Sequence, residues 1–169
     1  MQAATERRFA HVPAGAGEAY SIIGEVITFK VTNSDTNGAF TVVELQGQPG
    51  GGPPLHTHAS SESFTILEGE FEFTGLDGGE PFVVRARPGD TVFIPGGDPH
   101  AYSVVGDRPG RTVLVFTPGT DMEGFFTEAG ERVMAGQPIS AGPPDFPALL
   151  AAGARHGLVF VGQPPAAEA

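Results

Sequence analysis

Residues 50–69 read GGGPPLHTHASSESFTILEG and carry the strongest pattern in the chain. His56 and His58 are two residues apart, so on a β-strand both side chains leave the same face. Glu62 follows at the same parity and can join them if the strand bends back slightly. Two imidazoles and a carboxylate that converge in this way suit a divalent metal ion. The competing interpretation is a histidine-containing loop beside an unrelated surface glutamate, and the HxH spacing alone favours it.

Residues 89–100, GDTVFIPGGDPH, change that balance. The segment begins with a short apolar strand from Val92 to Ile94 and continues through a turn rich in proline and glycine. It ends on His100, which opens another strand. A histidine placed in this way can act as a fourth ligand beside the first three. The two stretches together therefore predict one metal site.

The spacing of both stretches resembles the two signature motifs of the cupin superfamily. The fixed positions are occupied by Gly50, His56, His58, Glu62 and Gly69 in the first motif and by Gly89, Pro95, Gly97 and His100 in the second. The second motif normally closes with an asparagine where this chain has Val104, but that asparagine is not a metal ligand in the family. The resemblance implies an all-β fold, the cupin jelly-roll barrel or double-stranded β-helix.

Within the superfamily, the layout resembles single-domain quercetinase-like (quercetin 2,3-dioxygenase-like) proteins. The resembling stretches are PPLHTH, SFTILEGEFEF, PGDTVFIPGGDPHAY, VFTPGTDMEGFF and HGLVFVGQPP, within a span from about Tyr20 to Pro165. In that branch the metal ligands correspond to His56, His58, Glu62 and His100, and Glu62 is also the proposed base. The resemblance implies an enzyme with dioxygenase chemistry on a small aromatic or enolic substrate.

Three neutral imidazoles and one carboxylate leave one or two positions open on an octahedral ion. The ligand set suits one divalent transition metal, namely iron, manganese, nickel, cobalt, copper or zinc, and the sequence does not choose among them. Apolar neighbours predict an organic substrate that chelates the metal through oxygen atoms. The predicted pocket residues are Phe64, Ile66, Tyr102, Val104, Phe116 and Phe125. Tyr102 is either a supporting hydrogen-bond donor or a rim aromatic with its hydroxyl in water, and Phe125 also fits a helix packing anchor.

Composition narrows the class of partner. The 20 acidic and nine basic residues give a net charge of −11, which repels phosphate backbones and argues against nucleic-acid binding. Residues 1–20 contain no apolar run of signal-peptide length, and nothing later approaches a membrane span. We therefore expect a cytoplasmic protein whose partner is a small molecule. The absence of cysteine removes disulfides and thiolate ligands.

The chain of 169 residues fits one barrel with flanking segments. We predict an N-terminal arm at residues 1–19, a barrel with the metal site at residues 20–118, and a C-terminal helical extension at residues 119–169. A single barrel of this kind leaves a sheet edge that invites pairing, so we expect a homodimer. The strands from Ile22 to Val31 are the predicted contact.

The extension carries two helical patterns. Residues 121–135 place apolar side chains, from Met122 to Val133, at helical spacing. Asp145 is a predicted N-cap and Gly157 a predicted stop of a second helix, after which residues 158–161 form a short strand or a docking tail. His11 and His156 lie outside the motif spacing and are not predicted ligands.

Three functional hypotheses follow. The first is a metal-dependent dioxygenase of quercetinase type. The second is a non-oxidative cupin enzyme, an isomerase, cyclase or lyase acting on a small enolisable metabolite. The third is a metal-bearing binding protein without turnover.

Overall fold

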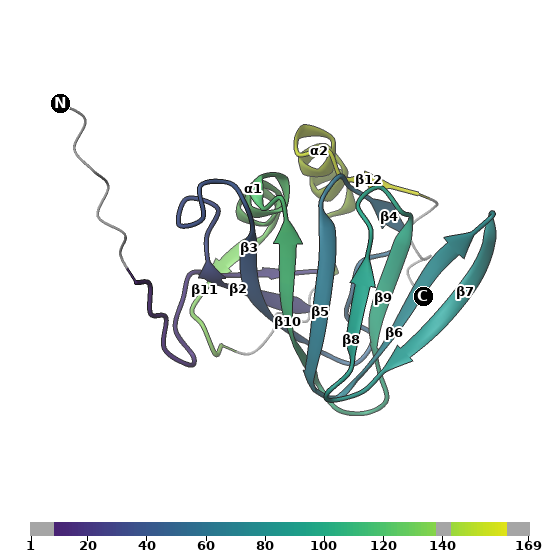
Figure 1. Cartoon of the computed structure of the whole chain (residues 1–169), viewed down its shortest axis with the longest axis horizontal. Helices are drawn as coiled ribbons and strands as arrows, with labels where there is room; N and C mark the ends of the chain where they lie inside the picture. The colour runs from purple at the N-terminus through teal and green to yellow at the C-terminus, as the bar shows by residue number, and fades with distance from the viewer. Residues whose placement is uncertain (1–8, 138–142, 162–169) are drawn as a thin grey trace.

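The computed structural model describes residues 9–137 and 143–161, which contain two antiparallel sheets and two helices. The sheets form the walls of a barrel, and the helices α1 and α2 lie together at one end of it (Figure 1). The predicted all-β jelly roll with short C-terminal helices is therefore confirmed. The beginning of the predicted arm and the end of the predicted tail lie outside the described residues.

Seven strands form the larger sheet and five form the smaller one. In spatial order the larger sheet contains β11 (Glu131–Val133), β1 (Ala19–Ile22), β2 (Glu25–Val31), β3 (Thr41–Gly47), β10 (Gly110–Thr117), β5 (Ser61–Glu68) and β8 (Thr91–Ile94). The smaller sheet contains β12 (Val159–Phe160), β4 (His56–Thr57), β9 (His100–Val105), β6 (Glu70–Asp77) and β7 (Glu80–Ala86). From β3 to β10 the chain changes sheet at every connection except that between β6 and β7, which gives the jelly-roll path.

The first histidine stretch is not the single bent strand that the parity argument required. β4 ends at Thr57 in the smaller sheet, and β5 begins at Ser61 in the larger one. The turn at Gly69 is likewise a crossing between sheets, because β5 and β6 do not pair. A Cβ on Gly69 would lie 2.7 Å from the carbonyl oxygen of Pro109, and its φ is +72°, so this crossing needs glycine.

Inward-facing side chains fill the barrel. Along β6 and β10 buried residues alternate with partly exposed ones, as expected for strands with one face on a core. Phe64, Phe71 and Phe116 are almost completely buried. Phe64 meets Phe73 edge to face with ring centroids 4.9 Å apart, a favourable aromatic geometry. This contact packs β5 of the larger sheet against β6 of the smaller sheet.

The two helices match the predicted pattern in part. α2 (Phe146–Arg155) is capped by Asp145, whose Oδ1 accepts a hydrogen bond from the backbone N–H of Ala148 at 3.1 Å, and Gly157 follows the helix with φ +71°. α1 (Thr120–Ala129) is shorter than predicted, because Gly130 takes an extended conformation and ends it. Val133 therefore lies in β11 and not on the helix.

The C-terminal segment contributes a strand to each sheet. β11 pairs with β1, and β12 pairs with β4, where Phe160 lies opposite His56. Of the two predicted forms for residues 158–161, the structure has the short strand. In the larger sheet β11 lies beside β1, and β3 lies beside β2. A homodimer to which the strands around Ile22 to Val31 contribute stays a prediction.

No helix among the described residues combines the length and the apolar character that a membrane crossing requires.

Candidate metal centre

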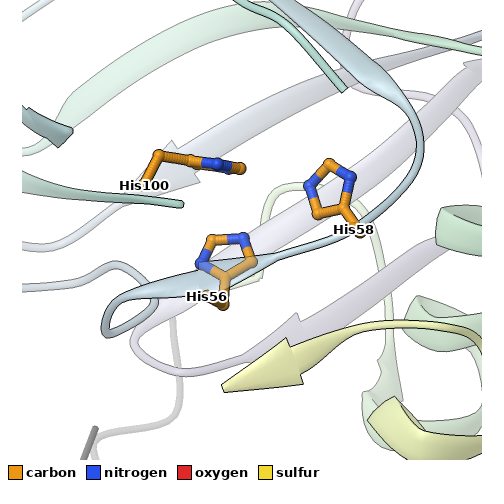
Figure 2. Close-up of side chains that lie close together, drawn as sticks. All are labelled: His56, His58 and His100. Carbon is orange, nitrogen blue, oxygen red and sulfur yellow. The ribbon is translucent and has the colours of Figure 1, made fainter. Parts of the chain in front are cut away.

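Three histidines meet at the helical end of the barrel. His56 on β4 lies directly opposite His100, the first residue of β9, and His58 follows β4. One ring nitrogen of each of the three lies within 4.8 Å of the corresponding atom of the others. Figure 2 shows the three imidazoles facing a common space. All three side chains are 2–3% exposed, although neutral imidazole is polar and its burial requires partners.

Glu62 reaches the cluster from the opposite sheet. Its Oε1 lies 3.1 Å from Nε2 of His58, and its Oε2 lies 3.1 Å from Nε2 of His100. The carboxylate is 3% exposed. The four predicted ligands are therefore neighbours, but for a different reason than shared parity on one strand. The chain crosses from β4 in the smaller sheet to β5 in the larger sheet, and Glu62 on β5 then faces the histidines.

Backbone carbonyls orient two of the rings. Nδ1 of His56 lies 2.9 Å from the carbonyl oxygen of Pro54, and Nδ1 of His100 lies 2.8 Å from that of Asp98. An Nδ1–H that donates to a carbonyl leaves the Nε2 lone pair of the same ring free to bind a cation. In both cases the carbonyl belongs to the residue two positions earlier in the chain. The local turns therefore select the tautomer that a metal ligand needs.

Several polar atoms of the cluster have no hydrogen-bond partner. Nε2 of His100 and Oε2 of Glu62 are 3.1 Å apart without the alignment of a hydrogen bond, and neither has another partner within residues 9–137 and 143–161. Nδ1 of His58 is also buried without one. Unpaired buried polar atoms are costly, and a bound cation would satisfy those that face the cluster. The donor set of three imidazoles and a carboxylate fits a divalent transition metal ion.

The charges of the cluster also suit a cation. Burial and the neighbouring His100 lower the pKa of His56 to about 4, so its imidazole is neutral. Burial alone would raise the pKa of Glu62, but the adjacent His100 and His58 outweigh it and lower that pKa to about 2. For His100 burial lowers the pKa, but the contact with Glu62 raises it by more, so the net change is an increase. A carboxylate therefore remains ionised among the buried imidazoles.

A small cavity of about 30 Å³ lies beside His56 and Glu62. This volume holds one or two water molecules. Of the residues predicted to form a substrate pocket, Tyr102, Phe116 and Phe125 line this cavity. Phe64, Ile66 and Val104 do not line it, because their side chains pack in the barrel core, where all three are at most 2% exposed.

The sequence interpretation did not identify most of the other residues that line the cavity. Met122 and Phe126 of α1, Leu158, and Glu25 at the start of β2 all line it. Glu25 is an acidic residue at the same parity as the buried Ile27 and Phe29, and that alternation could have marked it as inward-facing. No comparable signal brings the C-terminal residues to the pocket, because their position depends on how the helices pack.

Tyr102 lines the cavity and is not an aromatic residue at its rim with the hydroxyl in water. Its side chain is 8% exposed, and its hydroxyl donates a hydrogen bond to Oε2 of Glu25 at 3.0 Å. Burial and the nearby carboxylates of Glu25 and Glu62 hold the pKa of Tyr102 well above its usual value. The hydroxyl is therefore a hydrogen-bond donor at neutral pH.

Comparison with known proteins agrees with the fold. Residues 43–116 match the model of the cupin domain family (Cupin_2). A solved oxalate oxidase in complex with glycolate superimposes with a TM-score of 0.53 at 22% identity, covering 70% of this chain and 64% of that one. The oxalate decarboxylase of Lactobacillus farciminis, in its formate complex, gives a TM-score of 0.52 at 22% identity over 68% of this chain and 36% of that one. The chain therefore has the cupin fold, and residues 43–116 are similar to the cupin domain family.

A curated relative is closer in sequence. The dimethylsulfoniopropionate lyase DddQ of Ruegeria pomeroyi is 41% identical over 97 residues, which are 57% of this chain and 43% of that protein. The match thus spans less than half of the relative's length. The predicted cupin fold is confirmed and the resemblance to the cupin superfamily is supported over residues 43–116, whereas the quercetinase-like branch stays a prediction.

Proposed function

We propose that this protein is a metal-dependent lyase that acts on a small organic carboxylate. His56, His58, Glu62 and His100 would hold the ion. The observation that carries the proposal is the buried cluster of three imidazoles and an ionised carboxylate beside an apolar cavity. When bound, the ion would bind a carboxylate oxygen of the substrate and stabilise the negative charge that develops during proton removal.

The cavity holds one or two water molecules, so any substrate requires the lining side chains to move, and the smaller movement favours the lyase hypothesis over the dioxygenase hypothesis. A flavonol has three rings, and its entry would require α1 and the segment around Leu158 to leave the barrel mouth. A linear metabolite of a few carbon atoms requires a much smaller displacement. The similarity to a dimethylsulfoniopropionate lyase supports the same choice and names a first substrate to test.

The apolar wall also suits that substrate. Dimethylsulfoniopropionate carries a carboxylate at one end and a sulfonium cation at the other. Phe116, Phe125 and Phe126 line the cavity, and the ring of Phe126 lies 5.7 Å from each of the other two, centroid to centroid. Aromatic faces attract organic cations, and this attraction strengthens where water is excluded. The carboxylate end would lie toward the histidines and the sulfonium end toward the aromatic rings.

The proposed reaction is a β-elimination. Glu62, the ionised carboxylate at the cavity, takes the proton from the carbon next to the substrate carboxylate. The electron pair of that C–H bond forms the carbon–carbon double bond, and the C–S bond breaks with its pair leaving on sulfur. The products are acrylate and dimethyl sulfide, and Glu62 keeps the proton until it is returned to water.

The direct test is release of dimethyl sulfide. Protein reconstituted in turn with each candidate metal should release dimethyl sulfide from dimethylsulfoniopropionate, measured by headspace gas chromatography, and should form acrylate in equal amount. The metal-free protein is the control. Uptake of oxygen with flavonols or enolic ketones, without any elimination, would instead support the dioxygenase hypothesis. Absence of both activities would favour a binding protein.

A further inference from the structure

Glu25 is a second carboxyl group at the same cavity, outside the histidine cluster. It opens β2 directly after a two-residue turn, Ile23 and Gly24, whose φ values are +48° and +74°. Both residues of this turn are left-handed, as in the tight hairpin turns that match strand twist. The side chain of Glu25 is 3% exposed and lines the cavity together with Tyr102 and Glu62.

The neighbouring strand β3 lies close beside this carboxyl group. Gly47 on β3 lies opposite Glu25. A Cβ on Gly47 would lie 2.7 Å from Cγ2 of Val104 and 3.5 Å from Oε1 of Glu25. A side chain at Gly47 would therefore clash with Val104, whereas Oε1 of Glu25 lies at ordinary van der Waals distance from the same position.

The two oxygens of Glu25 have different environments. Oε2 accepts the hydrogen bond from Tyr102 at 3.0 Å. Oε1 is buried and has no hydrogen-bond partner in the part of the chain that the structure describes. A buried polar atom without a partner is costly unless a ligand or an ordered water satisfies it. The free atom belongs to a residue that lines the cavity, where such a ligand would bind.

In the metal-free protein the environment favours the neutral form of this carboxyl group. Burial raises the pKa of Glu25 to about 8, opposed by the hydrogen bond from Tyr102 and supported by the charge of Glu62. Because Tyr102 already donates to Oε2, the acid proton is placed on Oε1. A neutral carboxylic acid in an apolar site is a hydrogen-bond donor to oxygen.

We propose that Glu25 is a substrate-contacting residue whose Oε1 donates a hydrogen bond to a carboxylate oxygen of the molecule bound in the cavity. Tyr102 is the positioning residue that holds Glu25 in this orientation. The inference rests on the proposed function and deepens it, because it assigns the second oxygen of the substrate carboxylate. One oxygen lies toward the histidine cluster and the other toward Glu25, so the pocket selects carboxylates over monatomic anions.

The test uses ligand binding and not turnover. Cobalt(II) replaces the native ion, and the visible absorption of the cobalt centre reports the binding of two probes. Propionate has the carboxylate of the proposed substrate but no sulfonium group, and chloride has no second acceptor atom. Glu25→Leu should weaken propionate binding by about tenfold, the loss expected for one hydrogen bond in a dry pocket, and should leave chloride binding unchanged.

Three further variants make the result specific. Glu25→Gln keeps an N–H donor and should bind propionate within about threefold of the parent protein. Tyr102→Phe should weaken propionate binding without affecting that of chloride, because Glu25 loses its anchor. Thr28→Val changes a buried polar residue of the same strand that does not line the cavity, so both probes should bind as in the parent protein. Metal content is measured for each variant.

Two results would overturn the proposal. Unchanged propionate binding in Glu25→Leu would show that Glu25 does not contact the carboxylate. Equal loss of propionate and chloride binding would show that Glu25 acts through the metal ligands. The outcome is separable from the proposed function, because propionate is not a lyase substrate. If the predicted difference between the probes appears but no dimethyl sulfide forms, Glu25 recognises carboxylates in a protein with another reaction.

Discussion

The cavity has a histidine wall, which contains His56 and Glu62, and an aromatic wall, which contains Phe116, Phe125, Phe126, Tyr102 and Glu25. The two walls shift the pKa of a buried carboxyl group in opposite directions. On the histidine wall Glu62 lies 3.1 Å from two imidazoles, and its pKa falls to about 2. On the aromatic wall the carboxyl group of Glu25 has a tyrosine hydroxyl as its one hydrogen-bond partner within the described residues, and its pKa rises to about 8. Both side chains are 3% exposed, so burial alone does not explain the difference.

The number of polar partners decides the outcome. Desolvation penalises the charged form of both groups. Two imidazoles stabilise the Glu62 carboxylate enough to reverse that penalty, whereas one tyrosine hydroxyl is too weak to do so for Glu25. At neutral pH the cavity therefore has an anionic side that attracts a metal ion and a neutral side that can donate a hydrogen bond. Pairs of carboxyl groups whose pKa values are pushed apart are common where one acts as a base and the other as an acid.

The largest expected effect comes from removing a histidine of the first wall. His56→Ala should lose bound metal and, with it, at least about 99% of lyase activity, because the site loses one of its four proposed ligands and its metal affinity falls. Elemental analysis and dimethyl sulfide release measure the two losses. His11→Ala is the matched control, since His11 is exposed and far from the motif spacing. A His56→Ala protein with full metal content would contradict the proposed ligand set.

Glu62→Gln separates the two roles of the carboxylate. The amide keeps an oxygen donor for the metal but removes the basicity, so turnover should fall by at least about a hundredfold while much of the metal remains. Glu68→Gln, at the exposed end of the same strand, should change neither. Near-normal elimination by Glu62→Gln with full metal occupancy would show that the proton goes to another group.

Glu25 should make the metal-free protein less stable as the pH rises. Below about pH 4.5 the carboxyl group is neutral in both states. Between that pH and about 8 the unfolded chain releases the proton while the folded protein retains it, so stability falls, and above about 8 it no longer changes. Across this pH range the contribution of Glu25 to the free energy of unfolding falls by on the order of 4 kcal/mol.

Glu25→Gln is the variant that isolates this contribution. Glutamine does not titrate, so the parent protein should lose stability relative to Glu25→Gln between about pH 5 and pH 8 in urea denaturation of metal-free samples. Glu62 contributes in the opposite sense, with stability that is lost as the pH falls below about 4.5 toward 2, and it is common to both proteins. Parallel stability curves for the two proteins would show that Glu25 is ionised in the folded state.

The histidine wall was predictable and the aromatic wall largely was not. His56, His58, Glu62 and His100 are identified by fixed spacing, and that spacing survives even though the parity argument for Glu62 was wrong. Local rules also predicted the α2 cap at Asp145. In each of these cases the signal is a pattern of residue types within a short stretch of the sequence.

The aromatic wall depends on contacts between distant segments. Glu25 meets Tyr102 across 77 positions of the chain, and Leu158 reaches the cavity through the packing of α2 and β12. Phe64 and Val104 have the inward parity of pocket residues, yet core packing covers them. Parity distinguishes the two faces of a strand, but it does not show how far along the strand the cavity extends.

The smallest expected effect tests whether the aromatic wall binds a cation. Phe125→Leu preserves apolar volume in part but removes one ring face from the cavity. If the sulfonium end lies on this wall, KM for dimethylsulfoniopropionate should rise about fivefold, the scale of one cation–π contact, while the inhibition constant of propionate changes by less than about twofold. Phe40→Leu, on a partly exposed ring that does not line the cavity, is the control. Equal weakening of both ligands would mean that Phe125 shapes the cavity without recognising charge. A rise confined to the sulfonium substrate would assign carboxylate recognition to the side of the histidines and Glu25, and cation recognition to the rings.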